Sequence, residues 1–193
     1  MQVGNWEIKV LTDKLPQKVA TAIGKLNEVL IGAEYEAIAY IGSQVANGTN
    51  HAVLAEQTVT TGRDTTNVVM LIFNEKPGEN EATLVNIERV VEGGQALGGT
   101  VVDVRTAINS EDMEMWNEAF EGFVGSKVVP FAYLGLQTTK GTSYIYAATV
   151  EPVVPDPSAH VAVVTINPMT KEVSFADMLS SKQASSLKYA FTW

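Results

Sequence analysis

The chain contains an internal repeat with an offset of 93 residues. The segment Ala39–Ala55, AYIGSQVANGTNHAVLA, aligns without a gap to Ala132–Ala148, AYLGLQTTKGTSYIYAA, and seven of the 17 aligned positions are identical. The same offset places Asn67–Phe73 on His160–Ile166. Order, spacing and identity agree together, so chance is a poor explanation. Because a repeat of this length corresponds to a repeated structural unit, any fold assigned to one half must also suit the other.

The first half predicts one helix among five strands. Apolar residues recur at spacings of four, three and four, as on the buried face of an amphipathic helix. These residues are Val19, Ile23, Leu26 and Leu30. Pro16 suits the first helical turn, where a missing N–H breaks no helical hydrogen bond. We expect the helix over 14–31 and strands over 6–11, 34–46, 49–60, 66–73 and 81–91.

The second half predicts the same order of elements. Its apolar helical positions have spacings of three, four and three, and they are Met113, Trp116, Phe120 and Phe123. Ser110 is a good N-cap residue for this helix. We expect the helix over 110–124 and strands over 100–106, 128–139, 142–153, 159–166 and 171–178.

These elements predict an α+β protein with two tandem domains. Each helix must lie across one face of an antiparallel sheet, because its apolar face has no other surface on which to be buried. The glycine-rich segment 92–99, EGGQALGG, falls where the repeat requires a boundary. We therefore expect domains over 1–93 and 94–193. The second has a C-terminal tail, in which Leu187, Tyr189, Phe191 and Trp193 alternate with other residues and suggest an added strand.

Composition excludes several classes of function. The chain has no cysteine, which removes disulfides, thiolate catalysis and cysteine metal sites. Its net charge is −9, shared between −5 in 1–95 and −4 in 96–193, and it lacks the basic clusters that nucleic-acid binding needs. No apolar run approaches ~18 residues, so no membrane span is expected. The start, MQVGNWEIKV, lacks the pattern of a signal peptide, which favours a cytoplasmic location; a trimmed secreted chain is the alternative.

The segment Gln44–His51, QVANGTNH, predicts a hairpin. Asn47-Gly48 between two apolar runs favours a type I′ turn. Val45, Ala46 and Gly48 would form a small, uncharged tip, which could fill a cleft in another protein. The simpler alternative is a good turn with no further use. The repeat bears on this choice, because the second half keeps Gln, Gly and Thr and changes the residues paired with Val45 and Asn47.

A strand, a long helix and a four-stranded meander, with Q-x-x-x-G-T-N at the first hairpin, resemble the cystatins, inhibitors of papain-like cysteine proteases. The resemblance implies three protease-binding elements. One is a segment around an N-terminal glycine, here Gly4. Another is the first hairpin, here Gln44, Val45, Ala46, Asn47 and Gly48. The third is a second hairpin over 74–80, with Lys76, Pro77 and Gly78 at its tip.

Departures from the family pattern are visible in both halves. Ala46 stands where the family has valine, and neither second hairpin carries the proline–tryptophan pair of many members. The second half departs further at its first hairpin, where the sequence is Gln137-Thr138-Thr139-Lys140-Gly141. These differences weaken the inhibitory interpretation more than the fold.

Other chemistry is sparse. The two histidines, His51 and His160, lie in different halves and are expected to be exposed on strands. No phosphate-binding loop or catalytic arrangement is visible, so we expect no enzymatic activity, no cofactor and no metal. The leading function is a non-enzymatic protein-binding protein, with a papain-like cysteine protease as the most specific partner. The alternatives are a structural or assembly module and a small-ligand binder using the concave sheet face. The sequence leaves the oligomeric state open.

Overall fold

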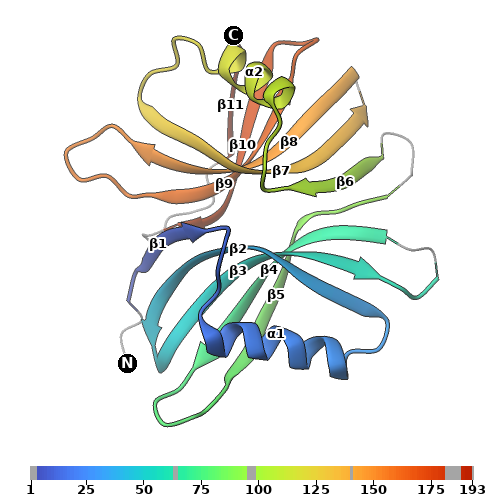
Figure 1. Ribbon diagram of the computed structural model, residues 1–193. Coiled ribbons are helices and arrows are strands. Elements are labelled where there is room, and N and C mark those ends of the chain that lie inside the picture. Colours follow the sequence, from blue (N-terminus) through green and yellow to red (C-terminus); the bar gives the residue numbers. More distant parts are fainter. Residues whose placement is uncertain (1–3, 63–64, 95–98, 140, 181–187, 193) are drawn as a thin grey trace. The chain divides into compact units, whose positions relative to one another are not determined.

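The computed structural model describes residues 4–62, 65–94, 99–139, 141–180 and 188–192. The chain divides into two compact units, Met1–Gly93 and Gly94–Trp193. Each unit contains one antiparallel sheet and one helix (Figure 1), which confirms the α+β class. In the described part of the chain, neither helix has the length and apolar character needed to cross a membrane.

Unit 1 has a five-stranded sheet in the order β1-β2-β3-β4-β5. Its helix α1 lies across one face of this sheet (Figure 1). The elements are β1 (Trp6–Leu11), α1 (Gln17–Val29), β2 (Ala33–Ala46), β3 (Gly48–Val59), β4 (Thr65–Glu75) and β5 (Ala82–Val91).

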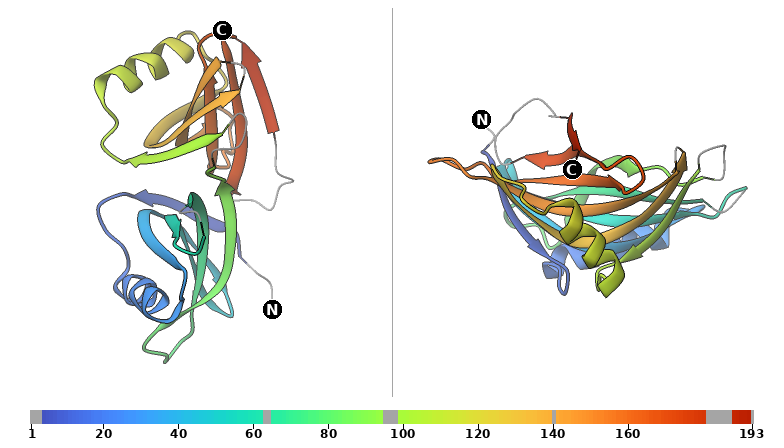
Figure 2. Two further views of the ribbon diagram at one scale, coloured as in Figure 1. Left: turned by 90° about the vertical axis from the view of Figure 1, so that its right-hand side faces the viewer. Right: turned by 90° about the horizontal axis from the view of Figure 1, so that it is seen from above.

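Unit 2 repeats this plan and adds a sixth strand, giving the order β11-β10-β9-β8-β7-β6. The elements are β6 (Thr100–Arg105), α2 (Ser110–Ala119), β7 (Ser126–Thr139), β8 (Gly141–Pro152), β9 (His160–Asn167), β10 (Glu172–Ser180) and β11 (Lys188–Thr192). β11 lies beside β10 at the sheet edge (Figure 2) and pairs with it antiparallel. The added strand predicted in the tail is thus confirmed over 188–192; Leu187 and Trp193 lie outside the described residues.

A core between helix and sheet holds each unit together. In unit 1, Val19 and Ile23 of α1 are buried against the sheet, where Val53 and Leu71 are fully buried. In unit 2, Trp116 of α2 takes this role; its ring packs edge-on against Tyr146 at 5.1 Å between centroids. Full burial of one such side chain contributes about 1.5–3 kcal/mol.

Two equivalent glycines allow the first strand of each unit to lie close to the second. β2 has a bulge between Tyr40 and Gly42, and β7 has the matching bulge between Tyr133 and Gly135. A Cβ atom on Gly42 would overlap the carbonyl oxygen of Glu7 in β1, and one on Gly135 would overlap a carbonyl oxygen of β6. Glycine is therefore required where one backbone approaches another this closely.

The second helix is shorter than its apolar spacing predicts. α2 ends at Ala119, because the chain turns at Phe120 and continues through Gly122 with φ of +71°. Phe123 still packs inward, at 5.4 Å from the Phe120 ring, but it does so from the turn. The N-cap is Asn109, whose side chain accepts a hydrogen bond from the Asp112 N–H at 2.8 Å, and Ser110 is the first helical residue.

The first helix and the first hairpin also differ from expectation. α1 begins at Gln17, so Pro16 is its N-cap residue and lies outside the first turn. Asn47 does not have the positive φ that a type I′ turn requires, whereas Gly48 has φ of +103°. The turn is tight, with Ala46 opposite Gly48, and only the glycine needs left-handed backbone.

Two glycine-to-alanine variants should change stability in opposite directions. We expect Gly42→Ala to destabilise unit 1 by about 1–3 kcal/mol, because the added methyl group displaces β1. Gly24→Ala should stabilise it by about 0.5–1 kcal/mol, because Gly24 is exposed in α1 and a Cβ there meets no atom within 4 Å. Urea unfolding followed by circular dichroism measures the unfolding midpoint of each variant. A Gly42→Ala midpoint equal to that of the wild type would contradict the requirement for glycine at this position.

Candidate functional site

The N-terminal segment lies beside the first hairpin. The Gly4 N–H donates a hydrogen bond to the Val45 carbonyl oxygen at 2.8 Å. The Gln44 Nε2 donates to the Gly4 carbonyl oxygen at 3.0 Å. The pairing of β1 with β2 continues this contact, since Trp6 is opposite Gln44. Two of the three elements predicted from the sequence are therefore adjacent.

The second hairpin adjoins the first through Gly48. Thr49 of β3 is opposite Glu75 of β4, and a Cβ on Gly48 would overlap the Glu75 carbonyl oxygen. The loop that follows β4 begins at Lys76, and Gly78 in this loop has φ of +81°. We call the set Gly4, Gln44–Gly48 and Lys76–Gly78 the hairpin edge.

The hairpin edge presents an apolar tip with polar groups beside it. Val45 is 69% exposed, and Asn47, Lys76, Pro77 and Gly78 are exposed as well, whereas Ala46 and Gly48 are half-buried. The ammonium of Lys76 lies 3.6 Å from the Glu79 carboxylate, so a carboxylate stands beside this charge.

A chain of side-chain amides runs across the strands behind this edge. The Asn74 Nδ2 donates to Asn50 Oδ1 at 2.7 Å, and the Asn50 Nδ2 donates to Gln44 Oε1 at 3.0 Å. The Gln44 Nε2 then donates to the Gly4 carbonyl oxygen. The three side chains are neighbours in register, Gln44 opposite Asn50 and Asn50 opposite Asn74. These hydrogen bonds join β4, β3, β2 and the N-terminal segment.

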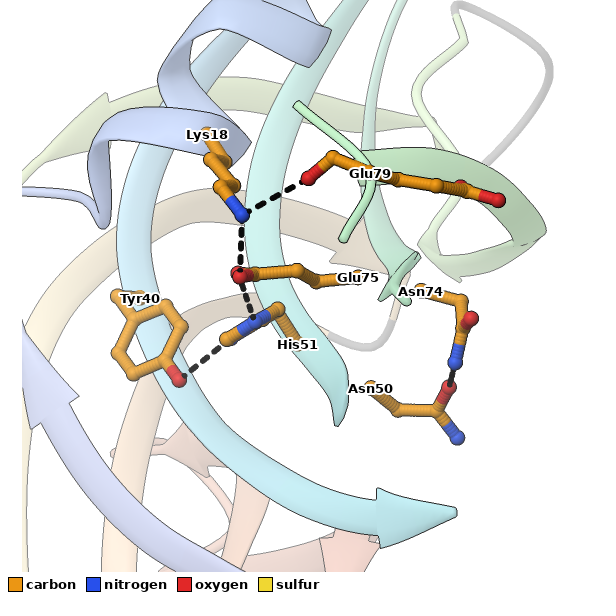
Figure 3. A network of polar contacts seen from close by, with 7 residues as sticks. All are labelled: Lys18, Tyr40, Asn50, His51, Asn74, Glu75 and Glu79. Carbon is orange, nitrogen blue, oxygen red and sulfur yellow. Dashed lines mark hydrogen bonds and ion pairs between the residues drawn. The ribbon is translucent and has the colours of Figure 1, made fainter. Parts of the chain in front are cut away.

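A second polar network ties the same hairpin end to the helix (Figure 3). The Lys18 Nζ of α1 donates to Glu75 Oε1 at 2.8 Å and to the Glu79 carbonyl oxygen at 3.0 Å. The other Glu75 carboxylate oxygen lies 3.3 Å from His51 Nε2. His51 Nδ1 is 3.0 Å from the Tyr40 hydroxyl. Burial raises the pKa of Tyr40, and the hydrogen bond from Lys18 lowers the pKa of Glu75.

Both histidines differ from the expectation of exposed strand residues. His51 is only 8% exposed, and its two ring nitrogens face Tyr40 and Glu75. The His160 side chain is 12% exposed, and its Nε2 lies 3.2 Å from the Asp177 carboxylate. The alternation of residues along a strand cannot reveal the burial of these histidines. It does not show which polar side chains contact a partner beneath the helix or on a neighbouring strand.

Unit 2 has the matching hairpin with different side chains. Gly141 has φ of +91° and lies against the Met169 side chain, which is 75% exposed. Asn167 Nδ2 donates to Ser143 Oγ at 3.1 Å, as Asn74 does to Asn50. Lys140 lies outside the described residues.

Sequence reasoning missed Lys18, Tyr40 and Asn50, and it included Asn74 and Glu75 only as the start of the predicted second hairpin over 74–80. The repeat offers a signal for some of them. The offset of 93 pairs Tyr40 with Tyr133, and one residue past the aligned segments 67–73 and 160–166 it pairs Asn74 with Asn167. Such a match of a polar residue at a strand end indicates a side chain with a structural role. The repeat gives no comparable signal for Lys18 or Glu75.

The described residues contain no group of three or more His, Asp or Glu side chains arranged to hold a metal ion. A scan against models of protein families, a search of curated proteins and a search of solved structures each gave no match to this chain. The resemblance to cystatins therefore stays a prediction.

The lowered pKa of Glu75 predicts an acid-sensitive contribution to stability. Because the folded-state pKa lies below the unfolded value, this contribution is present above the ordinary carboxyl range and is lost as pH falls through the folded-state pKa. Glu75→Gln should cost about 0.2–1 kcal/mol at pH 7. The difference from the wild type should shrink as pH falls below about 4.5.

Urea unfolding of both proteins across this pH range measures the effect. Glu28→Gln, at an exposed site of α1, is the matched control and should leave the pH profile unchanged. A constant difference between wild type and Glu75→Gln down to pH 3 would contradict the role of the ionised carboxylate.

Proposed function

We propose that this chain is a non-enzymatic, protein-binding protein built from two tandem cystatin-like domains. We further propose that unit 1 inhibits papain-like cysteine proteases by inserting the hairpin edge into the substrate cleft. The observation that carries the proposal is the adjacency of Gly4, the first hairpin and the turn after β4, through the Gly4–Val45 hydrogen bond and the approach of Gly48 to Glu75.

The chemistry of the hairpin edge suits a narrow cleft. Val45 offers an exposed apolar side chain, and the backbone at Gly48 has no side chain to obstruct a close approach. The amide chain and the Lys18 network hold the hairpins in place before any partner arrives. Since ordering a loop on binding reduces affinity, a hairpin that is already ordered favours tight association.

Unit 2 supports inhibition less well. Thr138 takes the place of Val45, and Met169 stands at the second turn, so the side chains offered to a partner differ although the backbone plan is the same. We therefore assign the inhibitory edge to unit 1 alone.

Titration of papain with the full chain tests the proposal. The wild type is expected to inhibit at micromolar concentration or below. Val45→Glu should weaken inhibition by about 100-fold, because a carboxylate without a partner would be buried in the cleft. Since Val45 is exposed, this change should not affect folding.

Ile31→Glu is the matched control. Ile31 is 99% exposed and precedes β2, whereas Val45 lies near its other end, so the same charge is added far from the hairpin edge. The control should inhibit like the wild type. Absence of inhibition by the wild type, or equal loss in both variants, would remove the proposed function.

A further inference from the structure

The amide chain behind the hairpin edge has a single direction. Asn74 donates to Asn50, Asn50 donates to Gln44, and Gln44 donates to the Gly4 carbonyl oxygen, at 2.7, 3.0 and 3.0 Å. Gln44 and Asn50 each use the NH2 group toward the N-terminal segment and the oxygen toward β4. The series of hydrogen bonds ends at the Gly4 carbonyl oxygen, and the Gly4 N–H donates to the Val45 carbonyl oxygen.

This direction determines how Gln44 can be used. A side-chain amide has a donor end and an acceptor end, and rotation by half a turn exchanges them. The hydrogen bond from Asn50 holds the Gln44 oxygen on the β3 side, so that its NH2 group must point at Gly4. Gln44 is only 9% exposed, and a buried polar group without a partner is costly, so the alternative rotation is disfavoured.

We propose that Asn50 is a positioning residue that acts through Gln44 to hold the N-terminal segment against the tip of the first hairpin. The hairpin edge thereby presents the N-terminal segment and the hairpin to a partner as one preformed surface. The consequence for binding rests on the proposed function. The positioning itself does not, and it can be measured on the free protein.

The repeat supplies the variant that separates this role from folding. Unit 2 has Ser143 at the position equivalent to Asn50, and this serine still accepts a hydrogen bond from Asn167. Asn50→Ser should therefore keep the contact with Asn74. Serine carries a hydroxyl group in place of the longer side-chain amide of asparagine, so it cannot present the same N–H donor to Gln44.

Asn67→Ser is the matched control. Asn67 lies in β4, the strand of Asn74, and is 3% exposed; its Nδ2 donates to Gln57 Oε1 at 3.1 Å, and its Oδ1 accepts from the Gly93 N–H at 3.1 Å. This contact is at the opposite end of the strand from Asn74. Like Asn50, Asn67 donates one side-chain hydrogen bond and accepts another, so the loss of these two bonds is matched, while the contacts of Gly4 are left intact.

The first measurement is NMR on the full chain without any partner. In Asn50→Ser, the nuclear Overhauser effects between Gly4 and Val45 should weaken, and exchange of the Gly4 amide hydrogen should be accelerated by about tenfold. Asn67→Ser should keep both signals as in the wild type. Unchanged Gly4 signals in Asn50→Ser, or equal changes in the two variants, would overturn the inference.

The second measurement is a double-mutant cycle in papain inhibition, with Asn50→Ser and deletion of residues 1–4 as the two changes. If Asn50 acts through the N-terminal segment, Asn50→Ser should weaken inhibition by about tenfold in the full chain and have no further effect after the deletion. Equal effects in both backgrounds would overturn this role. If the wild type does not inhibit papain, the proposed function fails, and the NMR comparison alone decides the positioning.

Discussion

The close approach of β1 to a glycine of β2 is the contact on which the arrangement of unit 1 depends. Because Gly42 has no Cβ, the backbone at Glu7 can lie directly against it, and the pairing of the two strands continues to Trp6 opposite Gln44. This register brings Gly4 to the hairpin, where both its N–H and its carbonyl oxygen find partners. A side chain at position 42 would separate β1 from β2. The N-terminal segment would then no longer be held beside the first hairpin.

The two units keep the residues that shape the backbone and differ in their side-chain networks. Tyr40 and Tyr133 are equivalent, yet they have different partners. The Tyr40 hydroxyl meets His51, whereas the Tyr133 ring lies under the Arg105 guanidinium at 4.2 Å, and that guanidinium is 3.0 Å from the Asp112 carboxylate. One backbone plan thus supports two sets of polar contacts, so the repeat is a stronger argument for a shared fold than for a shared function.

Local sequence patterns predicted the order of elements and most boundaries, because periodicity and turn residues act over a few neighbouring positions. They failed where a contact between residues far apart in the sequence determines the local structure. Phe123 continues the helical spacing but packs from a turn. The N-cap residue of α2 is Asn109, whereas the local pattern predicted Ser110. At the candidate site, the sequence identified the hairpin residues but missed Asn50, since an amide on a strand shows its role only once its cross-strand partners are known. His51 was misjudged for the same reason.

Neighbouring residues of β3 hold the hairpin end from both faces of the sheet. Successive side chains of a strand point to opposite faces, so Asn50 joins the amide chain on one face and His51 joins the Lys18–Glu75 network on the helix side (Figure 3). Salt and acid weaken the ionic contacts, but they do not neutralise an amide. The position of Gly4 rests on the amide face, so it should persist under conditions that loosen the contact between α1 and the second hairpin. A surface arranged in this way keeps its backbone geometry at the tip independent of the charges that stabilise the hairpin behind it.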